Sequence, residues 1–197
     1  MSIKNIVATA KLCTELRLSV VADALLANPR LTCFGAKPGR GIIDLQLASG
    51  KILYWVNSAF GSINIKGDKN TLFQIFQSGR VISVGGTTEG QAKRNFLRYI
   101  RLITDLGISA AYEDYQIQNI VATYDHKSPL SLSEIARRYK LEFEPELFPA
   151  VRYRIGELGV TVNIFHTGKC TILGAKSVER VSKAIYKIKD LLEECKK

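Results

Sequence analysis

Hydrophobic and polar residues alternate along most of this chain with a period of two, which is typical of β-strands. In segment 5–12 the alternation puts Ile6 and Ala8 on one side, and Val7 and Thr9 on the other. The two sides carry different residues. One side of such a strand can therefore pack into the hydrophobic core, while the other side remains available for a different contact. The same pattern predicts strands at 5–12, 60–66, 71–76, 80–85, 117–124, 150–155, 160–165 and 169–174.

A helical period replaces the alternation in four places. In one of them Phe96, Ile100 and Ile103 fall on a single stripe, with arginines on another face. In another, Ser131 and Glu134 have the spacing of a capping box, which predicts a helix start. The predicted helices are 17–27, a helix that follows Ser131, 88–106 and 177–195.

This order of elements occurs twice. Asn-Ile-Val-Ala-Thr stands at 5–9 and again at 119–123, and Ile-Phe-Gln-Ser-Gly-Arg at 75–80 is echoed by Ile-Phe-His-Thr-Gly-Lys at 164–169. The offset between the repeats falls from 114 to 89 positions, so the first repeat carries about 25 extra residues. We expect a first repeat at 1–107 with an insertion at about 30–58, and a second at 108–197.

The insertion has its own pattern. A turn-rich stretch at 35–41 is followed by two apolar runs, 42–47 and 52–56, on either side of Ser49 and Gly50. This arrangement predicts a β-hairpin.

Composition narrows the function. With 46% hydrophobic residues the chain can bury a core, and its net charge of +10 favours a polyanionic partner such as nucleic acid. The four cysteines form no CxxC pair and His126 and His166 stand alone, so we expect no metal site, no cofactor and no enzyme activity. No apolar run approaches the length of a membrane span, so no membrane partner is expected.

Because side chains alternate between the two faces of a strand, apolar side chains are expected on the sheet face away from the helices, provided that both long helices cover the same face. That face would carry Val7, Phe76, Ile82, Val121 and Phe165. An apolar patch on one side of an antiparallel sheet is typical of an interface.

These residues resemble the conserved core of the TATA-box-binding protein family. The similarity is carried by the two Asn-Ile-Val-Ala-Thr copies, by Gln116–Asn119, by Phe-Glu-Pro-Glu-Leu-Phe-Pro at 143–149, and by Thr-Gly-Lys and Gly-Ala-Lys at 167–169 and 174–176. It covers nearly the whole chain except 30–58. The resemblance implies an α+β fold: a saddle-shaped, ten-stranded curved antiparallel sheet of two pseudo-symmetric repeats, with four helices on its convex face.

The resemblance also implies minor-groove binding to double-stranded promoter DNA, with Phe pairs that kink the duplex. This family is itself the standard example of that mode. Phe148 and Phe165 match the C-terminal pair by position, and Phe76 matches one member of the N-terminal pair. Its partner is expected to be Phe60, with Tyr54 or Trp55 as the alternative.

Other positions on this face have matching chemistry. The minor groove presents mainly acceptors, and the amides of Asn5 and Asn119 can donate to them. Val7, Val121 and Ile82 offer apolar surface that penalises the amine of G·C pairs, while Arg80, Arg154 and Lys169 suit phosphates. The remaining expected DNA-binding residues are Thr9, Ser78, Val84, Thr123, Asn163, Thr167, Thr171 and Leu173.

The chain departs from the family pattern at several of these positions. Gln74 and Asn163 stand where the family has a Leu, and Val84 and Leu173 stand where it has a Thr. Thr171 replaces a groove-facing Val. We therefore expect relaxed TATA specificity. A paralogue that binds basal factors without DNA is the alternative, whereas an RNA-binding sheet would need its aromatics at the centre rather than at the ends.

The resemblance implies protein partners too. Glu144, Glu146 and Leu147 match the segment that binds the cyclin-fold basal factor, and a basic helix face, with Lys93, Arg98 and Arg101, matches the site of other basal factors. A nuclear location and a homodimer of the free protein are further expectations.

Overall fold

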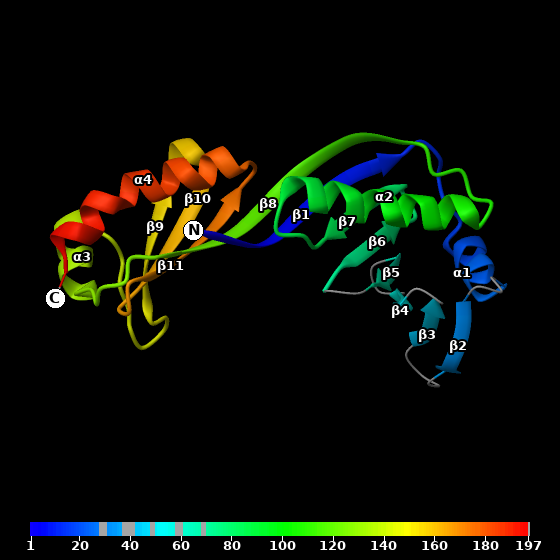
Figure 1. The fold of residues 1–197 in the computed structure, drawn as a ribbon, viewed down its shortest axis with the longest axis horizontal. Helices are drawn as coiled ribbons and strands as arrows, with labels where there is room; N and C mark the ends of the chain where they lie inside the picture. The colour runs from blue at the N-terminus through cyan, green and yellow to red at the C-terminus, as the bar shows by residue number, and fades with distance from the viewer. Residues whose placement is uncertain (28–30, 37–41, 48–49, 58–60, 68–69, 197) are drawn as a thin grey trace. The chain divides into compact units, whose positions relative to one another are not determined.

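The computed structural model describes residues 1–27, 31–36, 42–47, 50–57, 61–67 and 70–196, and for segments 31–36, 42–47 and 50–57 it describes only the backbone. It divides into two compact units (Figure 1). The N-terminal unit is Val7–Gln116, and the C-terminal unit is Met1–Ile6 with Ile117–Lys197. Strands β1 (Ser2–Leu12) and β8 (Tyr112–Asp125) contribute residues to both units.

The N-terminal unit is a sheet with two helices. Its strands follow the order β2-β3-β4-β5-β6-β7-β1. Its further elements are α1 (Leu18–Ala27), β2 (Leu31–Ala36), β3 (Ile42–Leu47), β4 (Gly50–Asn57), β5 (Ser62–Lys66), β6 (Leu72–Phe76), β7 (Arg80–Val84) and α2 (Glu89–Asp105).

The C-terminal unit has the same strand order as β5, β6, β7 and β1 of the N-terminal unit. Its strands follow the order β8-β11-β10-β9, and α4 runs along one face of them (Figure 1). Its elements are α3 (Leu132–Tyr139), β9 (Ala150–Ile155), the short 3-10 helix η1 (Gly156–Leu158), β10 (Val160–Phe165), β11 (Lys169–Ala175) and α4 (Val178–Glu194).

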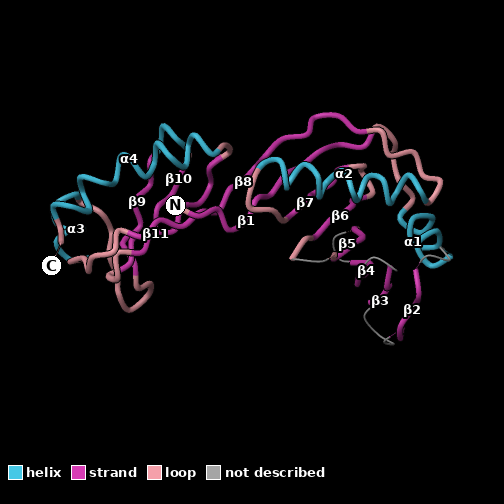
Figure 2. Tube along the Cα trace, viewed as in Figure 1, coloured by secondary structure: helices cyan, strands magenta, loops and turns pink. Residues whose placement is uncertain are grey.

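Every pairing whose register the structure gives is antiparallel. The order of β5, β6, β7 and β1 matches that of β9, β10, β11 and β8, so these are the repeated strands. The other three strands, β2, β3 and β4, continue the sheet at one edge (Figure 2). The described residues thus form eleven strands instead of the expected ten, because 31–36, 42–47 and 50–57 pair as strands. The β3–β4 pairing confirms the two hairpin strands, while Ser49 lies outside the described residues.

The predicted alternation explains the core of the N-terminal unit. On β6 the side chains of Phe73 and Ile75 are fully buried, whereas their neighbours are partly exposed. Phe73 stacks on Tyr99 of α2 with ring centroids 5.0 Å apart and lies 6.0 Å from Phe96. The apolar stripe of α2 therefore covers one face of this sheet, and burying such aromatic surface is the main stabilising contribution.

The core of the C-terminal unit is aliphatic. Ile120 of β8, Ile164 of β10 and Ile172 of β11 are fully buried, as are Val181 and Ile188 of α4. Both helix residues lie on the side of α4 that packs on the sheet. The sheet residues between the buried ones face away from α4.

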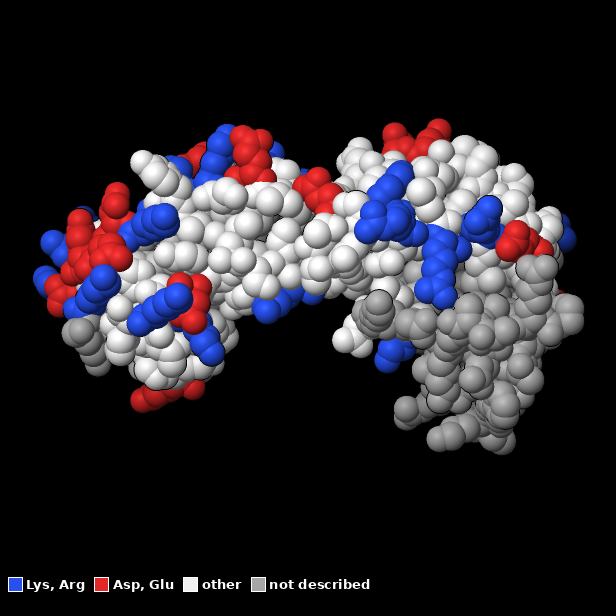
Figure 3. Space-filling model, in the orientation of Figure 1, with Lys and Arg blue, Asp and Glu red and all other residues white. Residues whose placement is uncertain are grey.

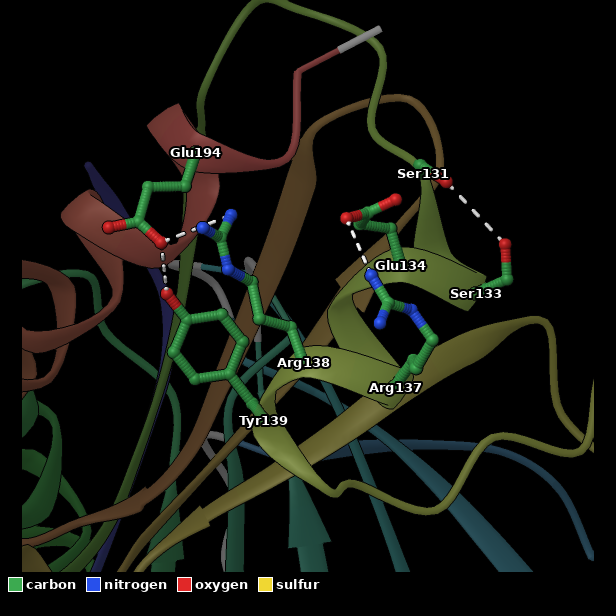
Figure 4. Close-up of polar contacts among 7 residues, drawn as sticks. All are labelled: Ser131, Ser133, Glu134, Arg137, Arg138, Tyr139 and Glu194. Carbon is green, nitrogen blue, oxygen red and sulfur yellow. Dashed lines mark hydrogen bonds and ion pairs between the residues drawn. The ribbon is translucent and has the colours of Figure 1, made fainter.

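The predicted capping box at Ser131 is wrong. Ser131 is the N-cap of α3, but its hydroxyl makes no capping hydrogen bond and lies 3.5 Å from the Ser133 hydroxyl, while Glu134 accepts from Arg137 (Figure 4). The neighbouring polar groups compete for the side chains that the box needs. A comparable cap forms instead at α2, where Thr88 Oγ1 accepts from the Gln91 N–H at 3.1 Å.

The end of α3 is tied to the end of α4 (Figure 4). The Tyr139 hydroxyl donates to Glu194 at 2.8 Å, and Arg138 lies 3.4 Å from the same carboxylate. These contacts are exposed, so each contributes little to stability by itself. Among the described residues, none of the helices has the length and apolar character needed to cross a bilayer.

Candidate nucleic-acid interface

On the face of the C-terminal unit that α4 does not cover, the central residues of β8, β10 and β11 are half-buried. On β8 the buried Ile120 and Ala122 alternate with the partly exposed Asn119, Val121 and Thr123. The same alternation leaves Asn163 and Phe165 of β10, and Thr171 and Leu173 of β11, partly exposed. The structure thus brings most of the predicted C-terminal DNA-binding residues together on one face.

Phe148 and Phe165 form a pair on this face. Their ring centroids lie 6.1 Å apart with planes inclined at 62°, and both side chains are partly exposed. The Arg152 guanidinium lies 5.5 Å from the Phe148 ring centre, within cation–π range. A cavity of about 650 Å³ opens beside Phe165, and its lining includes Thr167 and Lys169.

A polar row crosses the strands next to the Phe pair. Asn163 is opposite Arg152 on β9 and opposite Thr171 on β11, and Thr171 is opposite Thr123 on β8. Residues directly opposite one another share a face of the sheet. We call Arg152, Asn163, Thr171 and Thr123 the C-terminal row. The Oδ1 atom of Asn163 is buried and accepts no hydrogen bond from the described residues.

An equivalent row crosses the N-terminal unit. Gln74 is opposite Asn64 on β5 and opposite Ile82 on β7, and Ile82 is opposite Thr9 on β1. We call these four residues the N-terminal row. Its first residue is the buried Asn64, where the C-terminal row has the exposed Arg152, and two further differences bear on hydrogen bonding. Ile82 is aliphatic where its equivalent is a Thr, and Gln74 donates through Nε2 to the Ser62 hydroxyl at 3.1 Å.

The N-terminal unit has a smaller cavity of about 390 Å³, lined by Lys11, Phe76, Ser78, Arg80 and Ile82. Phe76 is the only wedge candidate of this unit whose side chain is described. Phe60 lies outside the described residues, and of Tyr54 and Trp55 only the strand register is described.

Three cationic residues predicted to contact phosphates, Arg80, Arg154 and Lys169, are exposed. The sequence reasoning missed Lys11 and Arg152. Lys11 lies on the same side of β1 as Val7 and Thr9, and Arg152 lies on the same side of β9 as Arg154. Extending the alternation to the next residue on that side of each strand would have found both. Lys11 also lies 3.8 Å from Glu113.

The predicted partner surfaces differ in exposure. Leu147 is 80% exposed between the exposed Glu146 and the predicted wedge residue Phe148. Cationic side chains gather over α2, where Arg98 and Arg101 are exposed (Figure 3). Lys93 is half-buried, because its ammonium packs on the ring of Tyr115 at 3.7 Å and of Tyr112 at 4.7 Å.

No metal-binding arrangement is found among the described residues. They contain no group of three His, Cys, Asp or Glu side chains that could hold a metal ion. Burial raises the pKa of the Cys170 thiol to about 12, with the Asp125 charge as the smaller cause, so it stays protonated at neutral pH. His126 is almost fully buried beside Glu193.

Comparison with known proteins identifies the family. The family model "Transcription factor TFIID (or TATA-binding protein, TBP)" matches residues 114–195. The TATA-box-binding protein of Emericella nidulans is 35% identical over 193 residues, covering 87% of this chain and 72% of that protein. The chain belongs to the TATA-box-binding protein family.

Other comparisons agree on the TATA-box-binding protein fold. The solved structure of Methanococcus jannaschii TBP is similar with a TM-score of 0.74 at 28% identity, covering 98% of both chains. The TATA-box-binding protein of Tetrahymena thermophila is 35% identical over 123 residues, covering 61% of this chain and 50% of that protein. The chain spans about half the length of this relative. The expected α+β fold, with two repeats in one antiparallel sheet, is confirmed.

Proposed function

We propose that this protein is a general transcription initiation factor that binds promoter DNA in the minor groove and bends it with inserted Phe side chains. The observation that supports this most directly is the Phe148–Phe165 pair, with centroids 6.1 Å apart on the half-buried face of the C-terminal unit. Isolated exposed aromatics are common on protein surfaces, but a contacting pair at the end of a strand face is suited to unstack a base step.

Burial of the Phe side chains can offset the free energy needed to unstack a base step. Unstacking one base step costs roughly 3 kcal/mol. At about 25 cal/mol per Å², burial of roughly 120 Å² of apolar surface offsets that cost. One Phe side chain buries about 150 Å² or more. The Phe148–Phe165 pair therefore supplies enough apolar surface for one kink, and the flanking Val121 and Leu173 add more.

Electrostatic attraction supplies the rest of the affinity. The net charge is +10, and Arg80, Arg154 and Lys169 are exposed on the strands that carry the face or at their ends. Each phosphate that a cation neutralises adds about −0.9 to the slope of log K against log salt. Binding that rests on these cations will weaken steeply as salt is raised.

Sequence preference follows from what touches the bases. Val7, Val121 and Ile82 present apolar surface that excludes the guanine amine, whereas Gln74 and Asn163 bring amides to the same face. We propose a preference for A·T-rich sites that is weaker than that of a strict TATA reader.

The proposed protein partners are a cyclin-fold basal factor on Glu144, Glu146 and Leu147, and other basal factors on α2 through Arg98 and Arg101. The exposure of Leu147 and of the two arginines supports this. A nuclear location, association of the free protein as a homodimer, and the repeat boundaries at about residue 107 belong to the same proposal. No catalytic step is part of it.

A second candidate function is sequestration of basal factors without DNA binding. Val84 and Leu173 favour it, because both are half-buried aliphatic residues at places where a hydroxyl would serve base contacts. Fluorescence anisotropy with a TATA duplex and a matched G·C-rich duplex, each across a salt series, separates the candidates. Salt-sensitive binding with a preference for the TATA duplex supports the initiation factor. Binding to neither duplex, with basal factors still bound, supports sequestration.

A further inference from the structure

Asn163 is the most unusual residue of the C-terminal row. Its side chain is partly exposed, yet Oδ1 is buried and no described residue donates a hydrogen bond to it. A buried acceptor without a donor is unfavourable, so Asn163 Oδ1 has the capacity to accept a hydrogen bond from a ligand. Asn163 lies two residues before Phe165, which places it beside the Phe pair.

The minor groove contains one donor that suits this acceptor. Every base pair offers acceptors there, and only guanine adds a donor, its N2 amine. We infer that Asn163 accepts a hydrogen bond from a guanine N2 amine beside the step unstacked by Phe148 and Phe165. This inference rests on the proposed minor-groove binding, and it goes further by assigning G·C acceptance to one residue and one half of the DNA site.

The amide can turn toward the groove at little cost. Because Oδ1 accepts no hydrogen bond from the part of the chain that the structure describes, rotation of the side chain breaks none with those residues at that atom. The adjacent members of the row then meet the remaining acceptors. The Thr171 hydroxyl and the Arg152 guanidinium are donors, and Arg152 lies over Phe148 at 5.5 Å, whereas the Thr123 hydroxyl already donates to the Ser2 carbonyl at 3.4 Å.

The N-terminal row lacks these features. Gln74 is already held within the protein by its hydrogen bond to Ser62 at 3.1 Å. The next position in the row is Ile82, which stands where the C-terminal row has Thr171. An aliphatic side chain against the groove floor penalises the guanine amine. The two halves of a pseudo-symmetric protein thus read G·C pairs differently, and a G·C pair in one half-site sets the orientation of the protein on DNA.

Inosine tests the inference directly, because an I·C pair differs from G·C only by the missing N2 amine. Starting from a duplex of A·T pairs, each position in turn is changed to G·C or to I·C, and affinity is measured by fluorescence anisotropy at fixed salt. For the wild-type protein we expect one position at which G·C binds at least as tightly as I·C. At the equivalent position of the other half, we expect I·C to bind about 10-fold more tightly.

Two variants identify the residue. Asn163→Leu is expected to weaken binding to the G·C duplex about 10-fold at the tolerant position and to leave the I·C and A·T duplexes within about 2-fold. Gln74→Leu, at the equivalent place in the other row, is the matched comparison: whatever its effect on overall affinity, the ratio of G·C to I·C binding at the tolerant position is expected to stay as in the wild-type protein.

Three outcomes would overturn the inference. In the first, the wild-type protein binds I·C more tightly than G·C at every position. This result is obtained with the wild-type protein alone. In the second, a tolerant position exists but Asn163→Leu leaves it unchanged. In the third, no duplex binds at all, which removes the proposed function together with this inference; the first two leave the proposed function standing.

Discussion

The backbone of one strand fixes the amide of another: the Gly174 N–H donates to Asn119 Oδ1 at 2.8 Å. Gly174 lies where the register between β8 and β11 shifts, with φ of +90°. Because a backbone N–H can only donate, the side-chain oxygen of Asn119 must face it, and the NH2 group is the part left to meet a ligand. A fixed donor on a half-buried face is suited to a groove that presents acceptors.

Asn119→Asp tests this arrangement. The aspartate keeps an oxygen for the Gly174 N–H, but it replaces the NH2 donor by an anionic oxygen that repels the groove. We expect DNA affinity to fall at least 10-fold, measured by fluorescence anisotropy, with little change in the thermal unfolding midpoint. Asn119→Leu is the neutral companion, which removes the donor without adding charge. Unchanged affinity in both variants would mean that the Asn119 amide does not contact bases.

The wedge makes a separate prediction about DNA shape. Phe148→Ala with Phe165→Ala removes the pair, and we expect a smaller bend in a duplex labelled at both ends for energy transfer. The affinity should fall by about 10-fold or more, because the apolar surface that the two rings bury against the DNA is lost and the bend that brings further contacts is not formed. Tyr186→Ala is the control, since Tyr186 is a highly exposed aromatic on α4. An equal bend in wild type and double variant would exclude insertion at this end.

Charge reversal tests the proposed basal-factor site. Glu144→Lys with Glu146→Lys changes two exposed carboxylates beside Leu147, and neither lies on a strand of the half-buried face. We expect the ternary complex of protein, DNA and cyclin-fold factor to weaken at least 10-fold in a mobility-shift assay. Binary DNA binding should not fall. If DNA binding falls in parallel with the ternary complex, the site assignment is wrong.

Much of the fold could be predicted because the repeats carry the same alternation in different residues. Ile6, Ala8, Ile120 and Ala122 are buried as their parity indicates. The antiparallel pairing then follows from the short turns between strands. The sequence predicted β3 and β4 of the insertion but not β2, nor that the three strands extend the sheet at its edge, because no second copy exists for comparison.

The site was less predictable where it depends on contacts across strands. The resemblance supplied Phe148 and Phe165, and parity supported Phe165. Neither could show that Arg152 lies over Phe148, since that needs the register of β9 against β10. Nor could they show the Asn119–Gly174 hydrogen bond, which depends on a register shift within β11.

The turn after Phe165 tests how the face is held in place. Gly168 has φ of +83°, its N–H donates to the Phe165 carbonyl at 2.9 Å, and its carbonyl accepts from the His126 N–H at 3.0 Å. A Cβ atom at Gly168 would collide with the Ser128 carbonyl oxygen. Gly159 also has a left-handed backbone, with φ of +62°, but a Cβ atom there would meet nothing within 4 Å.

Comparing alanine substitutions at the two glycines therefore separates the cost of backbone strain from the cost of a steric collision. We expect Gly159→Ala to lower the free energy of unfolding by about 1 kcal/mol, from strain alone. Gly168→Ala adds a collision with backbone atoms and should cost at least about 2 kcal/mol more. Urea denaturation of both variants measures the difference. DNA affinity should also fall in Gly168→Ala, because Thr167 and Lys169 flank the displaced turn. Equal unfolding free energies would show that the turn relaxes without strain, and that the position of Lys169 does not depend on it.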